Sequence, residues 1–155
     1  MDKEHTCCVT GHRDIPSNKV GEIQTKLRQE VLNAIREGYK HYISGFAAGI
    51  DLIFADIVTE LKGQYPITLE AAIPYPGRLN TPDMTFHRLI KECDLVKVHT
   101  AQYSKNCYMV RNRYMVDCST LVIAIHDGRK TGGTAATIRY ARKRERECVV
   151  REINL

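Results

Sequence analysis

Three short segments of the chain combine glycine with hydroxyl side chains, and two of them add basic side chains, a mixture that suits the binding of phosphate. They are Thr10-Gly11-His12-Arg13, residues 44–51 and residues 127–134. Glycine lets a ligand approach the backbone closely, and serine or threonine hydroxyls can donate hydrogen bonds to phosphate oxygens. We therefore predict that these segments contribute to one site for a phosphate-bearing ligand.

Two of these segments lead directly into predicted helices, whose first amides and positive dipole end favour an anion. The expected hydroxyl donors are Thr10, Ser44, Thr131 and Thr134, and the expected counter-charges are Arg13, Arg129 and Lys130. One glycine after a strand is most often only a turn, so the prediction rests on all three segments together. The chain has neither a GxGxxG run after its first strand nor a GxxxxGK[ST] run, which argues against ordinary dinucleotide dehydrogenases and P-loop NTPases.

The elements that must position these segments alternate along the chain. The expected strands are residues 5–10, 39–44, 67–73, 95–98, 121–125 and 148–153, and the main expected helices are residues 20–35, 50–61, 106–117 and 134–144. Such alternation predicts a three-layer α/β/α Rossmann-like fold with a mainly parallel sheet. In a doubly wound sheet, with an expected strand order of 3-2-1-4-5, ligands bind at the carboxyl edge, where the three segments would meet.

Length and composition are typical of one domain over residues 1–155, with 43% hydrophobic residues. The charged start of the chain and the lack of a long uncharged apolar run predict a cytoplasmic protein with no membrane partner. The cysteines form no CxxC pair and show no metal-like histidine spacing: they are Cys7, Cys8, Cys93, Cys107, Cys118 and Cys148. We therefore predict small core thiols and no metal site.

The formal net charge of +5 is compatible with an anionic partner. Much of the excess lies in one segment, with Arg139, Arg142, Lys143, Arg144 and Arg146, which we interpret as a solvated helix face. Nucleic acid binding has weaker support but is left open. A homo-oligomer is also expected, because the helix over residues 106–117 carries more apolar residues than one buried stripe requires.

Four longer motifs resemble the SLOG superfamily, which comprises the SMF/DprA and LOG proteins, and within it the YpsA-like branch. They are VTGHR at 9–13, ISGFAAGID at 43–51, RNRYMVD at 111–117 and GGTAAT at 132–137. The second motif is also similar to a segment of the DNA-processing protein DprA. The resemblance implies a Rossmann-like fold with a nucleotide-type ligand over the glycine segments, and it adds Arg111 and Asn112, which the residues alone would place on an exposed helical turn.

Together, the residues and the resemblance define one set of expected ligand-binding residues. They are Thr10, Gly11, His12, Arg13, Ser44, Gly45, Gly49, Asp51, Arg111, Asn112, Gly132, Gly133 and Thr134. The chain departs from the PGGxGTxxE signature of LOG-type phosphoribohydrolases, because Thr137 occupies the position of the glutamate. This departure argues against N-glycosidic cleavage.

Three functions follow, and the first is favoured. The chain can be a sensor or regulatory module that holds a nucleotide-derived ligand without turning it over, with no other cofactor identified. It can instead be an enzyme on nucleotides or nucleosides, such as an N-glycosidase or a deoxyribosyltransferase-like protein, with Asp51, Glu70 or Asp127 as the required carboxylate or His12 as acid or base. The third function is DprA-like binding of single-stranded DNA, with tyrosines as stacking surfaces.

Overall fold

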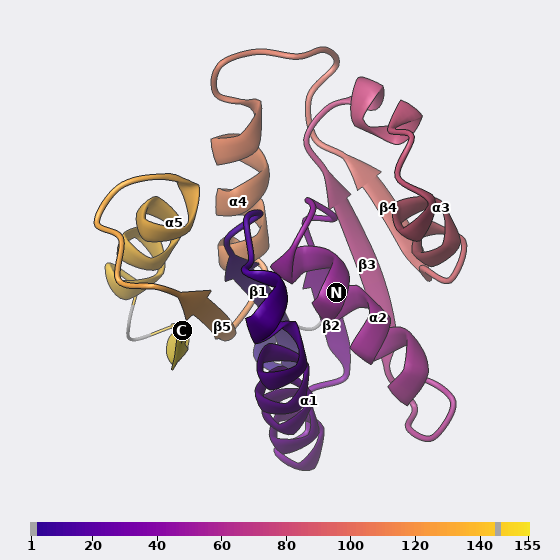
Figure 1. The fold of residues 1–155 in the computed structure, drawn as a ribbon, viewed down its shortest axis with the longest axis vertical. Helices are drawn as coiled ribbons and strands as arrows, with labels where there is room; N and C mark the ends of the chain where they lie inside the picture. The colour runs from indigo at the N-terminus through magenta and orange to yellow at the C-terminus, as the bar shows by residue number, and fades with distance from the viewer. Residues whose placement is uncertain (1–2, 145–146) are drawn as a thin grey trace.

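The computed structural model describes residues 3–144 and 147–155, which form a six-stranded parallel sheet between two layers of helices (Figure 1). The strands are β1 (Thr6–Gly11), β2 (His41–Ser44), β3 (Thr68–Ile73), β4 (Leu95–Val98), β5 (Leu121–His126) and β6 (Val149–Asn154). The α-helices are α1 (Val20–Arg36), α2 (Ile50–Leu61), α3 (Met84–Ile90), α4 (Cys107–Asp117) and α5 (Gly133–Arg142). The predicted three-layer Rossmann-like fold is confirmed.

The two faces of the sheet carry separate hydrophobic cores. On one face α1 packs against α2 and α2 against α3, and on the other face α4 packs against α5. Strand β1 serves both cores, because Cys7 and Val9 point into the first and Cys8 into the second. This burial on both sides explains why the strand reads as a continuous apolar run.

Local sequence signals place the ends of the elements close to where we expected them. Helix α1 buries Ile23, Leu27 and Val31 at helical spacing. The turn after its last residue, Arg36, contains Gly38, whose φ of +98° lets the amide of Tyr39 turn back to the carbonyl of Ala34 at 3.0 Å. The second strand consequently begins at His41 and not at Tyr39.

The strand order differs from the expected 3-2-1-4-5. The observed order is β4-β3-β2-β1-β5-β6, so the fourth strand extends the sheet beyond β3 and the fifth strand lies beside β1. The chain moves outward through β1, β2, β3 and β4, then returns across the opposite face through α4. The reversal of direction therefore falls between β1 and β5, and the loops that follow these two strands diverge at the carboxyl edge.

The cysteines have the interior positions expected of structural thiols. Cys7, Cys8, Cys107 and Cys148 are buried, whereas Cys93 and Cys118 are partly exposed. Burial raises the pKa of the Cys8 thiol well above its ordinary value, so this group stays protonated and unreactive. Across the described ranges, each helix is too short or too polar to cross a bilayer.

Candidate functional site

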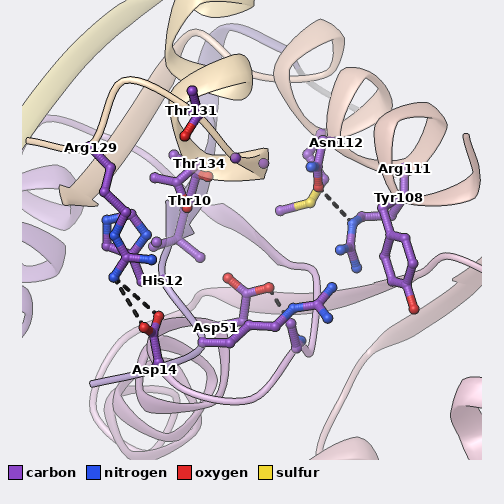
Figure 2. Close-up of a pocket in the computed structure, with 17 residues that line it drawn as sticks. Thr10, His12, Asp14, Asp51, Tyr108, Arg111, Asn112, Arg129, Thr131 and Thr134 are labelled. Atoms are coloured by element: carbon purple, nitrogen blue, oxygen red, sulfur yellow. Dashed lines mark hydrogen bonds and ion pairs between the residues drawn. The ribbon is translucent and has the colours of Figure 1, made fainter. Parts of the chain in front are cut away.

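A cavity of about 270 Å³ opens at the carboxyl edge of the sheet, between the loops that follow β1 and β5 (Figure 2). The predicted residues that line it are Thr10, Gly11, His12, Arg13, Asp51, Arg111, Asn112, Gly132, Gly133 and Thr134. Figure 2 shows Tyr108, Arg111 and Asn112 of α4 across the cavity from His12, Asp14 and Arg129. The reversal in strand order thus brings segments from four parts of the chain around one space.

The start of α5 forms one wall of this cavity. Gly132 is the N-cap residue with a φ of +97°, and no side chain caps the helix. A Cβ placed on Gly132 or Gly133 would meet no atom within 4 Å, so the space beside this backbone is open. The first amides of a helix have no partner inside the helix, and here they face the cavity with the positive end of the helix dipole.

Buried hydroxyl groups add further donors. Thr10 at the end of β1 and Thr134 in the first turn of α5 are each only 8% exposed and line the cavity. Neither hydroxyl has a hydrogen-bond partner among the residues that the structure describes. Since buried polar groups are nearly always hydrogen-bonded, these two hydroxyls are available to a ligand.

The three basic residues that were expected to pair with a ligand phosphate, Arg13, Arg129 and Lys130, have different surroundings. Arg129 is neutralised, because its Nη2 lies 3.2 Å from Asp14 and its Nε 2.8 Å from Asp127. Lys130 does not line the cavity. Arg13 is exposed, with its guanidinium 4.8 Å from the centre of the Tyr108 ring, and no carboxylate within the described ranges pairs with it. Arg13 is therefore the cation that remains free to meet an anion.

His12 is held as a neutral ring. Its Nε2 accepts a hydrogen bond from the backbone amide of Asp127 at 3.2 Å, so the proton of the neutral ring is on Nδ1. Burial lowers the pKa of His12, and the charge of Arg129 lowers it further, against the opposing effect of Asp127. At neutral pH the side chain offers the cavity one hydrogen-bond donor and no positive charge.

Arg111 and Asp51 form the floor of the cavity. Arg111 is 4% exposed, and its Nη1 donates to the carbonyls of Gly45 at 2.5 Å and Ala72 at 3.1 Å. Burial lowers the pKa of Arg111 and raises that of Asp51, and the opposite charge of each partner counteracts both shifts. The expectation of an exposed Arg111 is wrong, because this face of α4 turns toward the ends of β2 and β3.

Asn112 follows Arg111 and extends the polar floor. Its side-chain oxygen accepts from Nε of Arg111 at 2.8 Å, which leaves the amide nitrogen pointing to the cavity side. Within the described ranges this nitrogen has no acceptor. Arg111 thus fixes the orientation of Asn112, and Asn112 supplies the donor.

Three predicted residues lie outside this cavity: Ser44, Gly45 and Gly49. The Ser44 hydroxyl donates to the carbonyl of Asp51 at 2.8 Å and so fixes the loop that carries Asp51. A Cβ on Gly45 would come within 2.7 Å of Arg111, and one on Gly49 within 2.5 Å of the carbonyl of His12. These residues allow close packing of the loops.

The beginning of α2 differs from that of α5. The amide of Ile50 donates to the carbonyl of His12 at 3.2 Å, so the loop after β1 already occupies this helix end. A Cβ on Gly11 would meet the side chain of Ile50 at 2.5 Å, which shows how closely β1 and α2 approach. Only one of the two predicted helix starts therefore presents its backbone to the cavity.

Glu70 and Asp127 do not supply a carboxylate to the cavity. Glu70 is buried on the α4 side of β3, where it accepts hydrogen bonds from His41 at 2.7 Å and Tyr114 at 2.6 Å. Burial alone would raise the pKa of Glu70, but these two hydrogen bonds outweigh burial and hold it below its ordinary value. Asp127 pairs with Arg129 in the turn after β5, as noted above.

Tyr103 and Tyr108 were expected only as possible stacking surfaces for single-stranded DNA, and Tyr75 was not singled out in the sequence. Tyr75, Tyr103 and Tyr108 form a cluster with ring centres 5.4 to 6.4 Å apart, beside Arg13 and Arg78. Tyr75 and Arg78 belong to the PYPGR run that follows β3. Because β3 ends at the same edge as β1 and β2, the position of this run directly after β3 could have indicated that its side chains lie near the cavity.

Comparisons with known proteins support the fold and the family. The sequence model of the YspA SLOG family matches residues 7–153. UPF0398 protein BH1768 from Halalkalibacterium halodurans is 24% identical over 132 residues, which are 81% of this chain and 70% of that protein.

Two solved structures have the same fold. DNA processing protein A from Helicobacter pylori, described for its single-stranded DNA binding mode, matches 99% of this chain and 66% of its own at a TM-score of 0.65 and 15% identity. This chain therefore spans slightly less than two thirds of that protein. The structure of TM1055 matches 88% of this chain and 67% of its own at a TM-score of 0.56 and 15% identity.

Proposed function

Because the chain belongs to the YspA SLOG family, we propose that it binds a nucleotide or nucleotide-derived ligand through phosphate at the carboxyl edge of the sheet, as a sensor or regulatory module. The observation that carries the proposal is the open start of α5, where helix amides face one cavity together with the hydroxyls of Thr10 and Thr134, which have no hydrogen-bond partner among the described residues. Hydrogen-bond donors that are fixed on rigid elements and have no acceptor in the protein form a preorganised site for an anion.

The cavity also suggests how the ligand is oriented. Its phosphate is held by the amides of Gly133 and Thr134, where the dipole of α5 is strongest. Arg13 lies at the mouth and can pair with the same phosphate. The sugar and base then extend toward Tyr108, whose ring provides a flat surface for stacking.

The side chains in and beside the cavity are consistent with a ligand that is bound and not converted. Thr137, at the position of the LOG glutamate, donates its hydroxyl to the carbonyl of Gly133 at 2.8 Å and does not line the cavity. Arg129 and His12 are occupied by protein partners. This leaves donors that recognise phosphate and few groups that could move a proton.

One observation favours an enzyme as the second candidate. Asp51 is a buried carboxylate that lines the cavity, and burial raises its pKa. A carboxyl group with a raised pKa can act as a general acid near neutral pH. Product analysis after incubation with nucleotides separates the two candidates, since a free base would identify an N-glycosidase.

A ligand screen tests the proposal. We expect one or more nucleoside phosphates to raise the melting temperature of the protein and to bind in calorimetry, with the ligand recovered unchanged. The Arg13→Gln variant should lose most of this affinity, whereas Arg36→Gln, a matched change at the far end of α1, should bind as the wild type does. Single-stranded oligonucleotides belong in the screen at two salt concentrations, because a steep salt dependence would identify nucleic acid binding. No binding by any of these compounds would refute the proposal.

A further inference from the structure

A second hollow, of about 380 Å³, lies between α4 and α5, next to the cavity described above. The two spaces share Tyr108, Asn112 and Gly133 as lining residues. A molecule whose phosphate is held at the start of α5 is therefore already at the entrance of this hollow.

The charged residues that line the hollow are all basic. Both helices contribute basic side chains, namely Lys105 and Arg113 from the α4 side and Arg139 and Lys143 from the α5 side, and no carboxylate is among the described lining residues. Arg139 and Lys143 are also like charges at i and i+4 on one helix, an arrangement that destabilises a helix. Four cationic residues thus line one hollow, and none of the described lining residues is an acid.

The neighbouring basic residues behave differently. Arg142 pairs with Glu152 at 2.6 Å, and Arg144 pairs with Glu147 at 2.7 Å. In contrast, Arg113 stacks on the ring of Tyr140 and Arg139 donates to the backbone carbonyl of Lys130. Lys105 and Lys143 have no partner within the described residues. On the side of α5 that turns toward α4, the Asp117 carboxylate accepts a hydrogen bond from Tyr140 at 2.7 Å and pairs with Arg144 at 3.4 Å. Within the described part of the chain it forms no ion pair with Arg113, Arg139 or Lys143, and it is not among the described lining residues of the hollow. The basic segment is therefore not one uniformly solvated face.

We propose that the hollow between α4 and α5 is a second anion subsite, so that the ligand carries two separate phosphate groups. This inference rests on the proposed function and narrows it to a bisphosphorylated nucleotide or a short phosphodiester-linked chain. One phosphate lies at the start of α5, and the second lies among Arg113, Arg139 and Lys143. Binding relieves the repulsion among these cations and adds charge-assisted hydrogen bonds.

Calorimetry at low salt with defined probes tests this inference. The probes are adenosine and guanosine 5′-monophosphates, the matching 3′,5′-bisphosphates, and 5′-phosphorylated dinucleotides. We expect the better bisphosphate or dinucleotide to bind the wild-type protein at least about tenfold more tightly than the monophosphate, with a steeper dependence on salt. Comparison of the last two probes tells a phosphate monoester from a phosphodiester as the second group.

The decisive variant is the double change Arg113→Gln/Lys143→Gln. It should reduce affinity for the two-phosphate probe to that for the monophosphate and leave monophosphate affinity within about twofold. Arg36→Gln/Lys91→Gln removes the same charges from remote helix ends and should change neither value. Equal affinities of all probes for the wild-type protein, or equal losses in both double variants, would overturn the second subsite. A monophosphate that binds while the two-phosphate probes gain nothing leaves the proposed function standing, whereas a complete absence of binding overturns both.

Discussion

Gly133 offers a way to separate ligand binding from folding. It is the first residue of α5, and a Cβ there would meet no atom within 4 Å. The change Gly133→Asp should therefore be tolerated by the fold. A carboxylate in the first helical turn interacts favourably with the dipole by about 0.3–1 kcal/mol, which corresponds to a rise in melting temperature of about 1–4 °C for a chain of this size.

The same carboxylate should oppose the ligand. A phosphate held by the amides of Gly133 and Thr134 would lie about 4 Å from it, and two unit charges at that separation repel by about 4 kcal/mol at an effective dielectric constant of about 20. This corresponds to a loss of affinity of about a thousandfold. Thermal unfolding of the free protein and calorimetry with the best ligand from the screen measure the two effects independently.

Gly21→Asp is the matched control. Gly21 lies in the first turn of α1, also with open space at the Cβ position, and it does not line the cavity. This variant should show the same small gain in stability and bind the ligand as the wild type does. Normal binding by Gly133→Asp, or a loss of binding that arises only because the free variant is unfolded, would contradict phosphate binding at this helix end.

Three further predictions concern the framework of the site. Arg111→Met leaves two buried carbonyls without their donor and removes the positive charge that acts on Asp51, so urea unfolding should show a loss of about 3 kcal/mol in the free energy of unfolding; a loss under 1 kcal/mol would contradict this. Because the folded pKa of Glu70 is depressed, its stabilisation is fully present above its unfolded pKa of about 4.3 and is lost as pH falls through the lower folded pKa. Tyr114→Phe should therefore cost about 1.5–3 kcal/mol at pH 7 and progressively less as the protein is acidified below the unfolded pKa, and a cost that does not change with pH would refute this assignment. Gly49→Ala forces a Cβ against a carbonyl at a φ of +82° and should lower the melting temperature by several degrees, whereas unchanged melting would show that the loop adapts freely.

The elements of this fold were predictable because their signals are local. Residues 121–125 form an uninterrupted apolar run, and Gly38 lies in the turn after α1, where a positive φ is required. The order of the strands was not predictable in the same way. After α3 the next strand could pair beside β3 or beside β1, and no local pattern in Leu95–Val98 indicates that β4 pairs with β3.

The cavity at the carboxyl edge was predictable in its location, whereas the positions of some of its residues were not. Glycine and hydroxyl residues after β1 and β5 meet at one cavity because parallel strands end at one edge. The burial of Arg111 depends on how α4 is rotated about its axis, and its sequence pattern is too weakly amphipathic to show this. The occupied start of α2 depends on the path of the loop after β1, which the residues do not reveal.

Binding of phosphate at the start of α5 is tested most directly by NMR. The isotope-labelled protein is titrated with a nucleoside phosphate that binds in the screen, and the shifts of its backbone amide resonances are recorded. We expect saturable shifts of the amides of Gly132, Gly133 and Thr134, together with those of residues 10–13, and unchanged resonances along α1. Shifts confined to other parts of the chain, with the start of α5 unaffected, would contradict the claim that this helix end holds the phosphate.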